Sequence, residues 1–248
     1  MENTCLYFLY TGKKTIPSHI THLIIDGHFN HSITLTQDIT HLIFGDVYNQ
    51  PCCSLPPSIT HLTFGNSYNQ PTTQIPPSVK HLAFGYAYNQ PVVLPENVLY
   101  VKFGYCFDQH VDLPSGIVRL TLGGNYDYPI KLSHLKYLTH LKFGWCYNHP
   151  TLLPDGIIHL SFGTFYDQPT ILPQSLISFK YGGYKPSIFL EQLLNNYNLQ
   201  VFEFTLCESD DINNMMTNHV RTNIHNLKMK NVSLLFLCCC WSIVQANT

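Results

Sequence analysis

Hydrophobic and polar residues alternate in a short segment that recurs along most of the chain. In residues 59–78, Leu62 and Phe64 alternate with His61 and Thr63, which is the two-residue period of a β-strand. This pattern predicts that Leu62 and Phe64 face a core, while His61 and Thr63 face outward. The segment therefore predicts a short strand with one buried and one exposed side.

The residues that follow this strand predict a turn and an extended return. Gly65 ends the strand, and Tyr68 supplies another large side chain. Residues 69–71, Asn-Gln-Pro, indicate a turn, because Asn bonds to its own backbone and Pro restricts φ. Residues 75–77, Ile-Pro-Pro, favour an extended path, since the prolines exclude a helix. Each unit is then a strand, a turn and a return.

The unit repeats with a period near 20 residues. The large residue before the glycine position recurs with spacings of 19 to 21 at Ile25, Phe44, Phe64, Phe84, Phe103, Leu122, Phe143, Phe162 and Tyr181. Such a period indicates a solenoid, in which neighbouring units bury a core that no single unit can form. We expect a mainly β, leucine-rich-repeat-like parallel solenoid of about nine rungs, each a turn of 19–21 residues, with strands about 4.8 Å apart.

The ends of the chain depart from this rhythm. We expect an N-terminal cap in residues 1–15, the repeat solenoid in 16–182, and a small α/β cap in 183–206. In this cap, residues 187–198 have helix-like apolar spacing, and the alternation from Val201 predicts a last strand. Residues 207–248 are assigned to a linker and an apolar tail.

The apolar tail leaves two alternatives open. The largely apolar segment of thirteen residues from Val232 is too short to span a bilayer, which takes about 20. The segment either packs against the solenoid or attaches to a membrane through palmitoylated cysteines at Cys238–Cys240. Packing is the favoured prediction.

Composition narrows the set of possible functions and partners. Charged residues make up 11% of the chain and the net charge is -2, which argues against a nucleic-acid partner. The nine cysteines show no CxxC spacing, and the N-terminal segment does not fit a signal peptide. We therefore expect an intracellular, cytoplasmic monomer without disulfides. No P-loop, HExxH or GxSxG fingerprint occurs, so we expect neither an enzyme nor a cofactor.

A column of histidines suggests chemistry. His22, His41, His61 and His81 occupy the same position in consecutive repeats, and His140 and His159 do so later. Stacked imidazoles could bind a metal or respond to pH, and they could equally be a surface position repeated by duplication. We favour the last of these and expect no metal site, but we also expect a loss of stability on acidification, because stacked imidazolium ions repel.

The turn contains a second polar column. Its members are Asn30, Asn49, Asn69, Asn89, Asp108, Asp127, Asn148 and Asp167. An ionised Asp cannot donate a hydrogen bond, so this position is predicted to accept hydrogen bonds near solvent rather than to form a buried amide ladder. Paired carboxylates also suggest acid–base catalysis, but these follow the repeat and lack unlike environments.

The chain resembles the FNIP repeat family, which is similar to leucine-rich repeats. The family's box of an aromatic residue, Asn, any residue and Pro reads YNQP from Tyr48, Tyr68 and Tyr88, with variants from Tyr126, Tyr147 and Tyr166. The resemblance implies an amoebal or giant-virus source. Many members carry an F-box, which implies a ubiquitin-ligase substrate adaptor. Only about fifteen residues precede the first return segment here, so no F-box is expected.

We expect a non-enzymatic scaffold that binds an unidentified protein through its strand-lined concave face. Variable outward positions carry the candidate binding residues Tyr86, Tyr100, Lys102, Tyr105, Arg119, Lys142 and Trp145. Tyr, Trp and Arg dominate binding hot spots, although some of these rings could merely pack on neighbouring rungs. The alternative function is a ubiquitin-ligase adaptor-like protein without its own F-box.

Overall fold

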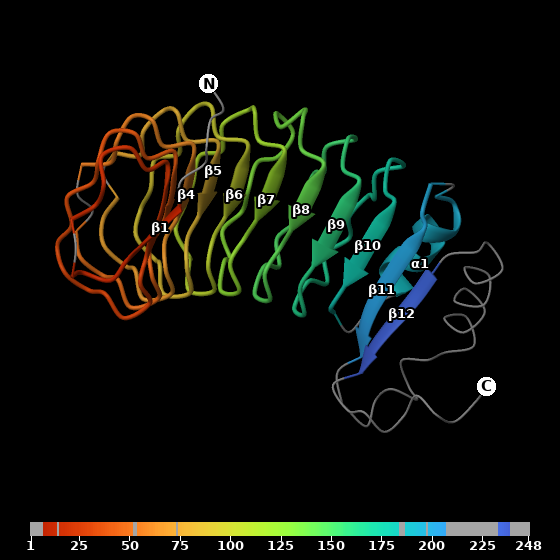
Figure 1. Cartoon of the computed structure of the whole chain (residues 1–248). Coiled ribbons are helices and arrows are strands. Elements are labelled where there is room, and N and C mark those ends of the chain that lie inside the picture. Colours follow the sequence, from red (N-terminus) through yellow and green to blue (C-terminus); the bar gives the residue numbers. More distant parts are fainter. Residues whose placement is uncertain are drawn as a thin grey trace. The chain divides into compact units, whose positions relative to one another are not determined.

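The protein is mainly β and divides into two compact units, Met1–Tyr128 and Pro129–Thr248. The computed structural model describes residues 7–13, 15–51, 54–72, 74–183, 187–196, 198–206 and 233–238. Each unit is a parallel β-solenoid, and together the units carry about ten turns (Figure 1). The prediction of a mainly β solenoid with little helix is confirmed.

The described residues of the first unit contain seven short parallel strands, which pair in chain order. They are β1 (Tyr7–Tyr10), β2 (His22–Ile25), β3 (His41–Ile43), β4 (His61–Thr63), β5 (His81–Ala83), β6 (Tyr100–Lys102) and β7 (Arg119–Thr121). In Figure 1 they form one wall of the coil, and turns and return segments complete each rung. Strand β1 lies in the segment assigned to the N-terminal cap, and no strand was predicted there.

The strands of the first unit stack in register, so that equivalent residues form columns. His22 pairs with His41, His41 with His61, and His61 with His81. His81 then pairs with Tyr100, and Tyr100 with Arg119. Each column therefore displays one position of the repeat, and a substitution in one rung meets its counterparts in the rungs on either side.

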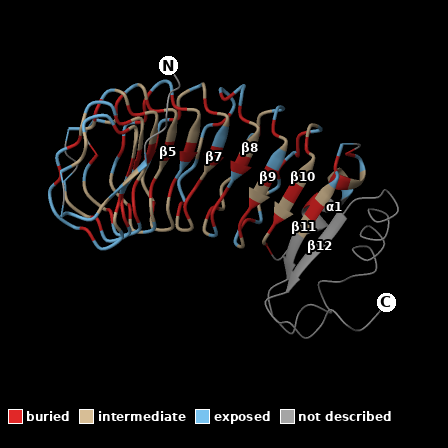
Figure 2. Ribbon diagram, viewed as in Figure 1, coloured by how far each residue is buried: buried red, intermediate tan, exposed pale blue. Residues whose placement is uncertain are grey.

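The core of the first unit is built from two columns of stacked aromatic rings. One column runs through Phe44, Phe64, Phe84 and Phe103, with ring centroids 5.3 to 5.7 Å apart. The other comes from the turn and contains Tyr48, Tyr68, Tyr88, Phe107 and Tyr126, at 6.0 to 6.4 Å. Nearly all of these rings are fully buried, and Figure 2 shows the buried residues recurring in every rung. The aromatic residue of the box is thus a core residue.

The turn column accepts hydrogen bonds, as predicted. The Oδ1 atom of Asn69 accepts from the backbone N–H of Asn89 at 2.9 Å and from Nε2 of Gln90 at 3.2 Å. The backbone N–H of Asp127 donates in the same way to Oδ1 of Asp108, at 3.1 Å. Because only the oxygen is used as an acceptor, Asp replaces Asn without loss of the bond.

The second unit has the same repeat and a different end. Its strands are β8 (His140–Lys142), β9 (His159–Phe162), β10 (Ser178–Tyr181), β11 (Val201–Leu206) and β12 (Ser233–Cys238), and its helix is α1 (Ser187–Leu194). The strands pair in parallel and in chain order. Both the helix and the strand β11 occur where the sequence predicts them.

Helix α1 continues the core beyond the last repeat. Phe189 is fully buried and its ring stacks on that of Phe162 at 5.9 Å. The side chain of Gln192 accepts from the backbone N–H of Leu172 and donates to the carbonyl of Thr170. The helix thus covers the apolar core at the end of the repeats and forms hydrogen bonds with backbone groups there, as another rung would otherwise do.

The apolar tail contributes strand β12. Its residues pair in parallel with β11, from Ser233 opposite Val201 to Cys238 opposite Leu206. For residues 233–238 the structure therefore bears out packing on the solenoid. The rest of the cysteine run and the predicted linker in residues 207–232 lie outside the described residues.

Candidate protein-binding surface

The outward side of the strands in the first unit, here called the strand face, carries a continuous stack of rings. The imidazoles of His22, His41, His61 and His81 stack at 4.0 Å between centroids, with interplanar angles of 12° to 13°. Tyr100 extends the stack at 4.2 Å from His81. Each ring therefore restricts the motion of its neighbours, and the strand face presents a rigid column.

Threonines set the orientation of three of these imidazoles. The hydroxyl of Thr60 donates to the carbonyl of Thr40 and lies 2.9 Å from Nδ1 of His61. When the single hydrogen of the hydroxyl goes to the carbonyl, its oxygen accepts from Nδ1–H of His61, and this tautomer leaves Nε2 as an acceptor. Thr40 and His41 make the same contact, and Thr21 lies at the same distance from Nδ1 of His22.

The stack disfavours protonation. Partial burial, followed by the neighbouring imidazoles of His61 and His22, lowers the pKa of His41 to about 4. Burial and nearby histidines also lower the pKa of His61 and of His81. These three imidazoles are therefore neutral at pH 7, and the column does not act as a positive stripe there.

The geometry provides no metal site in the described residues. No group of three or more His, Cys, Asp or Glu side chains converges there in a way that could hold an ion. Because the histidines lie in a straight column one rung apart, they contribute parallel rings to a surface and do not surround a point.

The C-terminal half of the strand face contains a groove of about 450 Å³. Tyr100, Lys102 and Arg119 line it, together with the outward residues His61, Thr63, His81, Ala83 and Thr121. The guanidinium carbon of Arg119 lies 6.0 Å from the centre of the Tyr100 ring. Three of the candidate residues are thus brought together, and the register of β5 with β6 adds His81, which sequence analysis had placed in a separate column.

Two other candidate residues follow, in the sequence, two of the strands that line this groove, and they form a stacked pair. Tyr86 and Tyr105 follow the ends of β5 and β6, and their rings stack at 5.1 Å with an interplanar angle of 3°. Tyr86 is 55% exposed, while Tyr105 is half-buried. A Cβ on Gly124 would lie 2.4 Å from the Tyr105 ring, so the backbone of the next rung packs flat against it. The rings pack on neighbouring rungs and still expose area.

The last two candidate residues belong to the second unit. Lys142 ends strand β8 and pairs with Ser161 of β9. Trp145 follows it and is 58% exposed. Both side chains are exposed, as expected for an outward strand position at Lys142 and for a position just past the glycine at Trp145.

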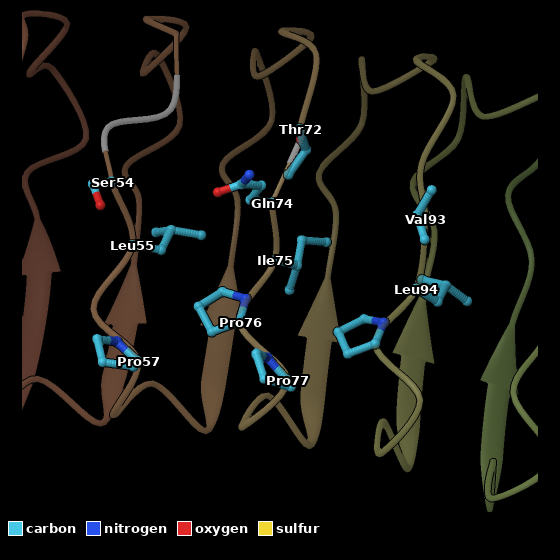
Figure 3. A pocket seen from close by; sticks show the side chains of 11 residues that line it. Ser54, Leu55, Pro57, Thr72, Gln74, Ile75, Pro76, Pro77, Val93 and Leu94 are labelled. Atoms are coloured by element: carbon cyan, nitrogen blue, oxygen red, sulfur yellow. The ribbon is translucent and has the colours of Figure 1, made fainter.

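A second hollow, of about 670 Å³, lies along the return segments of the first unit (Figure 3). Its lining includes Leu55, Ile75 and Leu94 from three successive rungs, with prolines beside them. No charged side chain is among the described residues that line it. The described lining of the hollow thus offers apolar contact area and contains no His, Cys or carboxylate side chain.

Fold and surface together define the class of this molecule. Parallel stacked rungs of about 20 residues with a strand-lined face make it a β-solenoid repeat protein, a class typical of non-enzymatic scaffolds. Residues 29–67, 52–87 and 68–106 match the family model FNIP Repeat. The chain therefore contains FNIP repeats in residues 29–106.

A comparison with curated proteins found no match to the chain. Within the described residues, no helix has the length and apolar character that crossing a membrane requires.

Proposed function

We propose that this protein is a non-enzymatic scaffold that binds another protein through the strand face of the first unit, around β5, β6 and β7. The observation that supports it is the groove in which Tyr100, Lys102 and Arg119 converge. The surface is formed by outward positions of neighbouring strands, where residues vary without disturbing the core. A solenoid uses such positions to recognise partners.

The stacked rings favour binding energetically. Aromatic and Arg side chains dominate binding hot spots, and Tyr buries a large area while losing few torsional degrees of freedom. Here Tyr100 is held by His81, and Tyr105 by Tyr86 and Gly124. Because the free protein already restricts these rings, a partner orders them at little further entropic cost.

Lys142 and Trp145 extend the proposal to the second unit. A 58% exposed indole is a large apolar surface that a partner can cover, and Lys142 precedes it at an outward strand position. The adaptor alternative stays a prediction from the resemblance, since no contact in the described residues favours it.

The test is affinity capture from cells with the full chain as bait, quantified by mass spectrometry. We compare the native chain with Ala83→Phe, which fills the floor of the groove with an uncharged side chain from an outward position and removes no contact of the core. A second variant, Tyr86→Ser with Tyr105→Ser, removes the exposed ring pair. We expect the captured partner to be lost with either variant.

The control is Val93→Ser, because Val93 is 84% exposed on a return segment and is not on the strand face. It should retain the partner fully. All variants must melt within a few degrees of the native chain. Equal capture by the native chain and by the well-folded Ala83→Phe variant would refute binding through this face.

A further inference from the structure

We infer that the groove of the strand face takes an extended peptide segment rich in acidic residues. This inference rests on the proposed function and names the chemistry of its partner. It is based on the charges that line the groove, the shape of the surface and the spacing of its cationic groups.

The charge of the groove is one-sided. Lys102 and Arg119 line it and are exposed, and no carboxylate is among its described lining residues. In the described part of the chain, neither cation forms an ion pair; the salt bridge found there joins Lys180 to Glu203 in the second unit. Two unpaired cations in a partly enclosed groove favour an anionic ligand.

The guanidinium of Arg119 is positioned in advance of binding. Arg119 extends over the ring of Tyr100, which is itself stacked on His81. Lys102 lies on the strand between those of His81 and Arg119. A guanidinium held on an aromatic ring presents its N–H donors in a plane, which suits the two oxygens of a carboxylate.

The spacing suits an extended chain. Lys102 and Arg119 lie on adjacent strands and are diagonal neighbours, because Arg119 pairs with Tyr100 and Lys102 pairs with Thr121. One strand spacing and two residues along the strand place their Cα atoms about 8 Å apart. Alternate residues of an extended peptide lie about 6.6 Å apart on one side, within the reach of these two long side chains. The small residues Thr63, Ala83 and Thr121 leave the floor of the groove low enough to admit a backbone.

The neutral imidazoles favour a peptide over a nucleic acid. His61 and His81 line the groove as uncharged rings at pH 7, because burial lowers the pKa of both. Nucleic-acid binding takes many cations along a backbone, and this groove offers two within a chain of net charge -2. A short acidic peptide can pair its carboxylates with the two cations and pack its side chains on the neighbouring rings.

The test measures the fluorescence anisotropy of three labelled peptides as the full chain is added. Each peptide has about twelve residues, which is long enough to cross the groove when extended. The peptides alternate Tyr with Glu, with Gln or with Lys. We expect the Glu peptide to bind about tenfold or more tightly than the Gln peptide, and the Lys peptide not to bind. Lys102→Gln with Arg119→Gln should abolish the preference for Glu.

The control is Lys13→Gln with Lys136→Gln, which removes the same charge from two other exposed positions. It should keep the preference for Glu. Equal affinity for the Glu and Gln peptides, an unchanged preference in the Lys102/Arg119 variant, or tighter binding of a labelled single-stranded DNA would each overturn the inference. Those results leave the capture experiment with the uncharged Ala83→Phe variant unaffected, so failure of the acidic ligand is separable from failure of the binding surface.

Discussion

The glycine that follows most of the repeat strands is required by the closeness of adjacent rungs. A Cβ on Gly85 would lie 2.1 Å from the carbonyl oxygen of Gly65, and one on Gly65 would lie 1.9 Å from that of Gly45. Both distances are far below van der Waals contact, and the atom approached is backbone, which cannot rotate away. The glycine column thus lets consecutive rungs approach each other, and this role adds to ending the strand.

Replacing one of these glycines should destabilise the fold. We expect Gly85→Ala to lower the free energy of unfolding by about 1–3 kcal/mol, because the new methyl group forces two rungs apart. The measurement is urea unfolding followed by circular dichroism. Gly116→Ala is the matched control, since a Cβ there meets nothing within 4 Å. That variant should be neutral or slightly stabilising, and an equal loss in both variants would contradict this account.

The turn between strand and return is held by a side-chain acceptor from the preceding rung. Oδ1 of Asn49 accepts a hydrogen bond from the backbone N–H of Asn69, and Oδ1 of Asn69 accepts one from that of Asn89. A glutamine in the next turn donates to the same oxygen, at 3.1 Å for Gln70. The element is therefore not a self-contained turn, because each copy supplies the acceptor that the next copy uses.

This arrangement distinguishes two substitutions of similar size. Asn69→Asp keeps the acceptor for Asn89 and should leave the free energy of unfolding nearly unchanged. Asn69→Leu removes the acceptor from Asn89 and from Gln90, and should cost about 1–2 kcal/mol, since partial exposure lets water replace some of the lost bonding. Chemical denaturation compares the two variants. A larger loss for Asp than for Leu would show that the amide donor matters more.

Across the whole of the first unit, local interactions recur in every rung and combine into columns. The ring stack of the strand face runs from His22 to Tyr100, and the core stacks run beneath it. Such a stack has no counterpart in an unfolded chain, because its members are 19 or 20 residues apart. Properties that depend on it, including the lowered histidine pKa values, therefore belong to the folded molecule.

Acidification should destabilise the protein through this column. Folding lowers the pKa of His41 from 6.5 to about 4, and also lowers those of His61 and His81. Below pH 6.5 the unfolded chain therefore binds more protons than the folded one, and the stability present above that pH is lost as the pH falls toward 4. We expect the melting temperature to decrease between pH 7.5 and 5.5.

The control for this effect is the triple variant His41→Asn, His61→Asn and His81→Asn, which leaves His22, Tyr100 and Lys80 beside the column. Its melting temperature should vary less over the same pH range, because the titrating groups with lowered pKa values are absent. An identical pH dependence in the native chain and the variant would assign the effect to other groups.

Much of the architecture could be predicted because the same pattern of residues recurs in many repeats. Alternation at Leu62 and Phe64 identified the buried side of the strand, and the occurrence of Asp108 among asparagines identified an acceptor. Strand β1 was missed, because Tyr7 precedes its partner His22 by fewer residues than the period. The groove was found only in part, since Thr63 and Ala83 carry no distinctive chemistry of their own.

Sequence alone determined the period, the strand, the turn chemistry and the outward positions, because each depends on neighbours along the chain or on exact repetition. The tertiary structure decided which outward residues meet, since His81, Tyr100 and Arg119 come together only when β5, β6 and β7 pair in register. It also decided the neutrality of the histidines and the need for glycine at Gly85. Both follow from the distance between rungs, and no local pattern encodes that distance.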